Sequence, residues 1–116
     1  MKIYLDDQRC APDGWVRCYY PNEAIQLFRC NKAGTIDEIS LDHDLGEIGD
    51  YARTGKDVLY WMFDQVVNNP NFILPIIHIH TDNGKEMEMM RLTVNRMNEI
   101  YQGRQQESDE NDKGKV

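Results

Sequence analysis

Residues 39–46 (ISLDHDLG) form a short apolar run that ends in two carboxylates flanking an imidazole. The run has the partly alternating pattern of a half-buried strand, and the glycine at its end marks a turn. Asp42, His43 and Asp44 are costly to bury without partners, so we expect them at the mouth of a site and not inside a core. The question for the rest of the chain is which other polar residues lie near this strand end.

Three other segments have the composition of strands. Residues 1–5 are apolar and stop at Asp6 and Asp7, residues 15–20 are aromatic and β-branched, and residues 72–79 form the most continuous apolar run, predicted as a central strand. The link from the first to the second strand is too short for a helix, whereas a parallel pair normally needs a crossover of a dozen or more residues. The direction of the second strand is therefore left open.

Helical periodicity marks three further segments. One begins near Asn22 and is ended by Gly34, one follows a capping sequence at residues 54–57, and the last begins at Asn83. Strands that alternate with amphipathic helices favour an α/β fold. We expect a three-layer arrangement around a mostly parallel, four-stranded sheet.

The length of 116 residues allows one core, which we place in a domain over residues 1–103. Residues 104–116 have almost no apolar side chains and are predicted to be a disordered polar tail. The composition, 41% hydrophobic and 28% charged, is otherwise that of a packed soluble fold. The net charge of −7 opposes extended nucleic-acid binding but still allows a small phosphate compound held through a cation.

The cysteines indicate a reducing compartment. Cys10, Cys18 and Cys30 show neither a C-x-x-C pair nor clustered histidines, so we expect ordinary reduced thiols. No apolar run reaches 18 residues, and the sequence opens with a strand-like segment instead of a signal peptide. We expect a cytoplasmic protein without membrane contact.

Three of the four predicted strands end in polar clusters, which a parallel sheet would place along one edge. Several carboxylates in one place repel each other unless a cation or protons compensate. Asp6, Asp7 and Asp42 offer the hard oxygen ligands that suit Mg²⁺ or Mn²⁺. We therefore predict a divalent metal ion at these three residues.

The histidines of the same strand ends suit proton transfer near neutral pH. His43 and His80 could act as base and acid in opening a phosphodiester, with Asp44 orienting either His43 or a metal-bound water. These three residues are predicted to be catalytic. His78 lies within an apolar strand and is interpreted as a core histidine.

Three further polar residues are predicted to bind substrate. Arg9 could hold a phosphate oxygen, and Thr81 and Asn83 could add hydrogen bonds at the start of the last helix. Thr81 and Asn83 fit equally well as ordinary helix-capping residues.

Four motifs carry a resemblance to a known family. They are residues 5–15 (LDDQRCAPDGW), 40–46 (SLDHDLG), 54–59 (TGKDVL) and 80–83 (HTDN). Together they are similar to the cyclic-phosphate processing receiver domain, a divergent form of the receiver domain of response regulators. The resemblance covers residues 1 to about 100.

The resemblance implies a small receiver-like (flavodoxin-like) fold that lacks the first helix and the last strand of a full receiver. It also implies a divalent metal at Asp6, Asp7 and Asp42, and action on a cyclic phosphate of a nucleotide or RNA end. The lysine of the missing strand has no counterpart, which argues against phosphoacceptor signalling. We expect a metal-dependent phosphoesterase; the alternatives are a phosphate- or nucleotide-binding module without turnover and a degenerate receiver acting as a signalling adaptor.

Overall fold

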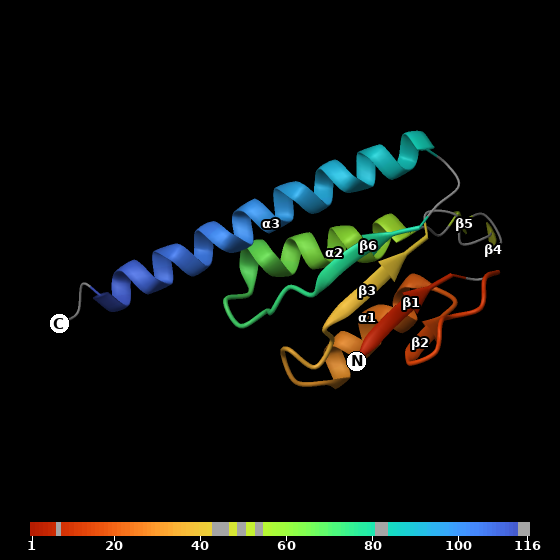
Figure 1. Ribbon diagram of the computed structural model, residues 1–116, viewed down its shortest axis with the longest axis horizontal. Helices are drawn as coiled ribbons and strands as arrows, with labels where there is room; N and C mark the ends of the chain where they lie inside the picture. The colour runs from red at the N-terminus through yellow and green to blue at the C-terminus, as the bar shows by residue number, and fades with distance from the viewer. Residues whose placement is uncertain (7, 43–46, 49–50, 53–54, 81–83, 114–116) are drawn as a thin grey trace.

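A four-stranded parallel sheet forms the centre of the protein (Figure 1). The computed structural model describes residues 1–6, 8–42, 47–48, 51–52, 55–80 and 84–113. The strand order is β2-β1-β3-β6, and all three neighbouring pairs are parallel. The strands of this sheet are β1 (Lys2–Leu5), β2 (Trp15–Cys18), β3 (Glu38–Leu41) and β6 (Ile76–Ile79). The predicted receiver-like α/β fold with a parallel sheet is confirmed.

Helices connect the strands from β2 onwards. The described helices are α1 (Pro21–Cys30), α2 (Gly55–Asn68) and α3 (Gly84–Lys113). A short antiparallel pair, β4 (Glu47–Ile48) and β5 (Tyr51–Ala52), lies between β3 and α2 in the chain. Figure 1 shows this pair close to the end of the sheet at which β3 finishes. The expected loop over the strand ends therefore includes a small hairpin.

All three described helices contribute to a single core on one face of the sheet. Ile3, Leu5, Ile39 and Leu41 are fully buried, and they share one hydrophobic cluster with side chains of α1, α2 and α3. In Figure 1 the strands lie in front of α1 and α2. The predicted three-layer arrangement is wrong for the described residues, which form two layers. The other face, which we call the uncovered face, carries the alternate strand residues.

The second strand runs parallel to the first although no helix separates them in the described residues. The register Lys2↔Trp15 to Leu5↔Cys18 fixes this direction. The link turns back through Gly14, whose φ of +86° is left-handed and favours glycine, and through the hydrogen bond from Trp15 N to Pro12 O at 3.1 Å. A compact loop thus replaces the first helix of a full receiver.

β6 is an edge strand, so its prediction as a central strand is wrong. Ile76 is 61% exposed. In the described part of the chain no strand follows α3, so nothing pairs with the outer side of β6. The apolar composition of the run reflects packing of its inner residues against the core and not a position inside the sheet.

The last helix continues through Gly103 to Lys113, whereas the sequence predicts a disordered polar tail over residues 104–116. The segment after Gly103 contains glutamine, glutamate and arginine, which have good helix propensity even without an apolar stripe. Arg104 is also fixed to the rest of the domain by hydrogen bonds to three backbone carbonyl groups. The absence of apolar residues predicts disorder, but helix propensity and the hydrogen bonds of Arg104 extend α3 beyond Gly103.

Replacing Gly55 by alanine is expected to lower the free energy of unfolding by about 1–3 kcal/mol. The added Cβ would overlap the backbone carbonyl oxygen of Asp42 and lie 3.3 Å from the Leu41 Cβ. Helix propensity alone predicts the opposite sign, because alanine favours a helix more than glycine does. Urea unfolding of the metal-free protein measures the difference.

Gly103→Ala is the matched control, since a Cβ at this position of α3 meets nothing within 4 Å. It should stabilise the protein by up to about 1 kcal/mol. Equal effects of the two substitutions would show that α2 does not pack against the end of β3 as closely as the structure has it.

Candidate functional site

Three neighbouring strands end in register at the candidate site. Asp6, Asp42 and His80 each directly follow the last residue of β1, β3 and β6. The ladder continues for one more step, with 3.1 Å from Asp42 N to Leu5 O and 2.9 Å from His80 N to Leu41 O. Since side chains alternate along a strand and the two leucines point into the core, the three polar side chains belong to the uncovered face.

The three side chains are close enough to share one cation. One ligand atom from each of Asp6, Asp42 and His80 lies within 4.8 Å of the others. Asp6 is 0% and Asp42 8% exposed, and the His80 side chain is 20% exposed. Two buried carboxylates at this separation repel each other unless positive charge compensates. Two carboxylate oxygens and one imidazole nitrogen form a donor set that fits a divalent metal ion.

The Asp6 carboxylate also organises the loop that follows β1. Its Oδ1 accepts hydrogen bonds from the backbone N–H groups of Gln8 at 2.8 Å and Arg9 at 2.9 Å. Its Oδ2 lies 3.4 Å from Arg9 Nη1 and 3.0 Å from His80 Nε2. Burial alone would raise the pKa of Asp6, but these hydrogen bonds outweigh burial and hold the pKa below its ordinary value. Asp6 is therefore ionised at neutral pH.

Ser40 belongs to the site, although it is not among the residues predicted from the sequence. Its Oγ lies 2.6 Å from His80 Nδ1, which places the His80 ring between Ser40 and Asp6. The Tyr4 ring stacks on a face of the His80 ring, with ring centroids 4.4 Å apart and planes inclined by 6°. A usable signal was present: Ser40 precedes Asp42 by two positions, so both side chains occupy the same face of β3.

His80 is held neutral by its surroundings. Burial lowers the pKa of His80 below its ordinary value, and the neighbouring Asp6 offsets this only in part. A neutral imidazole carries one N–H, on either Nε2 facing Asp6 or Nδ1 facing Ser40. The Ser40 hydroxyl can donate to Nδ1 or accept from it, so it supports either position of the proton.

The metal-free protein is expected to lose stability as the pH falls from 7 to about 5. The unfolded chain takes up a proton at His80 near pH 6.5, whereas the folded protein, with its lowered pKa, takes it up at lower pH. In this window the unfolded state binds more protons, so stability falls with the pH. Asp6, whose pKa is lowered too, adds a similar loss only near pH 4 and below.

Thermal unfolding in EDTA at a series of pH values measures this dependence. His80→Gln should flatten the slope between pH 7 and 5, whereas His78→Gln, a substitution outside the Asp6 cluster, should leave the His80 contribution intact. A slope that persists in His80→Gln would contradict the assignment.

The structure brings together the predicted site residues that it describes. Asp6, Arg9, Asp42 and His80 lie at one end of the sheet, with Arg9 bonded to Asp6. Their catalytic, metal-binding and substrate-binding roles stay predictions. The predicted site residues that lie outside the described residues are Asp7, His43, Asp44, Thr81 and Asn83.

His78 is not a core residue, so that interpretation is wrong. Its side chain is 49% exposed, and its Nε2 lies 3.0 Å from Glu38 Oε1. It stands in register with Ser40, whose side chain is on the uncovered face. The apolar run conceals this alternation, because Ile77 and Ile79 pack against the core while His78 points the other way.

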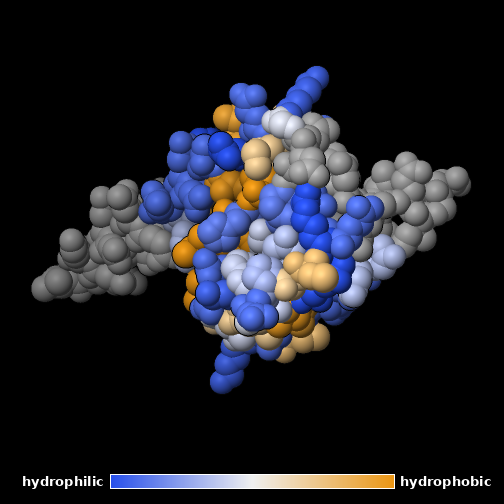
Figure 2. Space-filling view, turned by 45° about the vertical axis from the view of Figure 1, so that its right-hand side comes forward, coloured by the Kyte–Doolittle hydropathy of each residue, from blue (hydrophilic) through white to orange (hydrophobic). Residues whose placement is uncertain are grey.

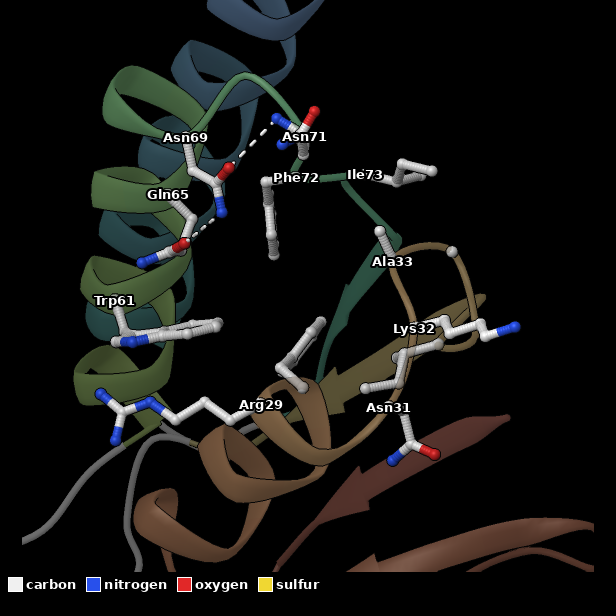
Figure 3. A pocket seen from close by; sticks show the side chains of 13 residues that line it. Arg29, Asn31, Lys32, Ala33, Trp61, Gln65, Asn69, Asn71, Phe72 and Ile73 are labelled. Carbon is white, nitrogen blue, oxygen red and sulfur yellow. Dashed lines mark hydrogen bonds between the residues drawn. The ribbon is translucent and has the colours of Figure 1, made fainter.

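A hollow of about 240 Å³ lies at the opposite end of the sheet, before β3 and β6 (Figure 3). The rings of Phe28, Trp61 and Phe72 surround it, with centroids 5.3 to 5.9 Å apart. In Figure 3, Trp61 and Phe72 turn into the hollow and Lys32 points away from it. None of the described residues that line it is acidic or a histidine, so it lacks the carboxylate and imidazole groups found at the candidate site.

The parallel sheet with buried acids after β1 and β3 defines a receiver-like α/β domain. The family model of the Cyclic-phosphate processing Receiver domain matches residues 1–96, and the chain belongs to this family. No curated protein and no solved structure matches the sequence. Over the residues that the structure describes, no helix is both long enough and apolar enough to cross a membrane.

Proposed function

We propose that this protein hydrolyses a cyclic phosphate on a nucleotide or on an RNA end, with a divalent metal ion bound by Asp6, Asp42 and His80. The observation that carries the proposal is the convergence of these three side chains within 4.8 Å at the ends of adjacent strands. Asp7 stays a predicted further ligand outside the described residues. We place the activity in the cytoplasm, which the free cysteines favour.

When bound, the metal ion would polarise a phosphate oxygen and lower the pKa of a bound water. For His80 to bind it through Nε2, the imidazole proton has to be on Nδ1, and Ser40 Oγ at 2.6 Å is the acceptor that holds it there. A nitrogen ligand beside two carboxylates suits Mn²⁺ better than Mg²⁺, which prefers oxygen ligands only. Of the two predicted ions we therefore favour Mn²⁺.

This arrangement changes the role proposed for His80 from proton transfer to metal binding, because Asp6 and Ser40 engage both of its nitrogens. We assign the binding of phosphate oxygens to Arg9, and its 40% exposed side chain supports this role. In hydrolysis a water oxygen bonds to phosphorus and releases a proton to the solvent, a ring P–O bond breaks, and the leaving oxygen takes up a proton. We propose that His43, which follows Asp42 in the chain, donates the proton to the leaving oxygen.

Incubation with 2′,3′-cyclic nucleotides, 3′,5′-cyclic nucleotides and cyclic dinucleotides tests the proposal. Each is incubated with Mn²⁺, Mg²⁺ or EDTA, and the products are separated by chromatography. We expect conversion of at least one compound with Mn²⁺, no conversion in EDTA, and loss of conversion in Asp42→Asn but not in Asp13→Asn, an exposed acid outside the site. Metal-dependent binding with intact recovery would instead indicate a binding module; neither binding nor conversion would indicate an adaptor.

Electron paramagnetic resonance of bound Mn²⁺ tests the ligand set directly. We expect a hyperfine coupling to an imidazole ¹⁴N nucleus that disappears in His80→Gln. Ser40→Ala should keep the coupling but weaken Mn²⁺ binding about 10- to 100-fold, as loss of the hydrogen-bond partner of a metal-binding histidine usually does. Binding of Mn²⁺ without nitrogen coupling would remove His80 from the ligand set.

A further inference from the structure

The uncovered face continues from the candidate site as a row of rings. Tyr4 stacks on His80, and Trp15 lies 6.3 Å from Tyr4 with an interplanar angle of 81°. Trp15 also lies 6.2 Å from His78, although the two residues come from the opposite edge strands β2 and β6. The indole therefore reaches across β1 and β3. We call Tyr4, Trp15 and His78 the aromatic row.

The composition of this face does not suit a covering layer of protein. Parallel strands that are buried on both faces are almost continuously apolar. Here the face also carries Lys2, Arg17 and Glu38, and Glu38 pairs with Lys2 at 3.1 Å and with His78 at 3.0 Å. Figure 2 shows that hydrophilic and intermediate residues occupy most of the described surface in its view, with hydrophobic residues in smaller groups. Rings flanked by charged groups suit a small planar ligand with a hydrogen-bonding edge.

We propose that the aromatic row binds the base of the substrate, so that the protein prefers nucleoside cyclic phosphates to cyclic phosphates that carry no base. This inference rests on the proposed function, because the base is placed by a phosphate held at Asp6, Asp42 and His80. Tyr4 connects the proposed phosphate site to the aromatic row, since it contacts both His80 and Trp15.

Two physical features support a nucleobase as the occupant. Open sheet faces that bind single-stranded nucleic acids use aromatic side chains in this way, because every base has a face that stacks. Lys2 lies 5.7 Å from the Trp15 ring centroid, and Glu38 lies beside it, so donors and acceptors for a base edge are at hand. The net charge of −7 opposes a long phosphate backbone, so one terminal nucleotide is the expected ligand.

Tryptophan fluorescence tests binding without any need for turnover. The chain has two tryptophans, so Trp61→Phe leaves Trp15 as the single reporter, and Trp61 lines the hollow at the other end of the sheet. With Mn²⁺ present, we expect an adenosine 2′,3′-cyclic phosphate to quench the emission and a glycerol cyclic phosphate to leave it unchanged. No quenching by any of the four nucleoside 2′,3′-cyclic phosphates would overturn the inference.

Steady-state kinetics separate the contribution of the base to substrate binding from that of the phosphate. In Trp15→Leu we expect KM for the nucleoside cyclic phosphate to rise roughly tenfold, with hydrolysis of glycerol cyclic phosphate unchanged. Trp15→Phe, which keeps a ring, should stay close to the unsubstituted protein and shows that the effect is not misfolding. Equal loss of both substrates would overturn the base assignment.

Failure of the proposed function and dimerisation through the uncovered face would each give a different result from failure of base binding. If neither substrate is converted under any metal, the proposed function fails, and fluorescence quenching still decides whether a base binds the aromatic row. Sedimentation that shows a dimer dissociated by Trp15→Leu would mean that a second copy covers this face, which would also overturn the inference.

Discussion

Replacing Asp6 by asparagine is expected to abolish stabilisation of the protein by Mn²⁺ and, with it, any hydrolysis. Asp6 supplies one of two carboxylates in the donor set, and it is fully buried. At a metal concentration 100 times the dissociation constant, binding contributes about 2.7 kcal/mol, roughly 10 °C in Tm. This increment should disappear in Asp6→Asn.

The metal-free Asp6→Asn protein should stay within about 1 kcal/mol of the unsubstituted one. An amide oxygen can still accept the N–H groups of Gln8 and Arg9, and the substitution removes repulsion between two close carboxylates. Thermal unfolding with and without Mn²⁺ measures both quantities, and Asp13→Asn serves as the control. If metal-free Asp6→Asn is unfolded, the residue acts through the loop and not through the metal.

Replacing Arg104 by methionine is expected to lower the free energy of unfolding by about 3 kcal/mol or more. The guanidinium donates to the carbonyl oxygens of Val66 at 2.9 Å, Asn69 at 2.8 Å and Phe72 at 2.7 Å. Val66 belongs to the last turn of α2, whose carbonyl groups have no partner within the helix. One side chain of α3 therefore closes the end of α2 and fixes the turn before β6.

Urea unfolding measures this loss, with Arg96→Met as the control. Arg96 lies on the same helix and its ion pair with Glu99 is exposed, so its loss should cost less than about 1 kcal/mol. Arg104→Lys should recover only part of the stability, because an ammonium group cannot reach three acceptors in the geometry of a guanidinium fork. Equal effects of Arg104→Met and Arg96→Met would contradict the anchoring role.

Much of the site follows from the sequence because a parallel sheet aligns its strand ends. Once β1, β3 and β6 are taken as parallel, Asp6, Asp42 and His80 have to meet at one end. This step needs only the positions at which apolar runs stop. Ser40 could also have been predicted, because its spacing of two from Asp42 places both side chains on one face of β3. A serine inside an apolar run is uncharged, however, and gives no sign of a functional role.

Other features depend on contacts between distant residues, which periodicity does not encode. The direction of β2 depends on a loop held by the Asp6 carboxylate, and the length of α3 on Arg104 meeting backbone groups of the α2–β6 turn. The apolar run of β6 predicts burial but not where the strand lies in the sheet. The one-sided packing of the helices could be inferred only by noting that the alternate strand positions are polar.

The two-layer arrangement has a thermodynamic consequence. A sheet that packs against helices on one side only encloses a smaller apolar interior than a chain of this length could form, and small interiors leave little net stability. Removal of the Arg104 side chain then takes away a large fraction of the free energy of unfolding. Binding of a metal ion would add a comparable fraction. If the proposed metal site is correct, the folded population of this protein should depend on metal supply, and the proposed ion would also control how much of the protein persists in a cell.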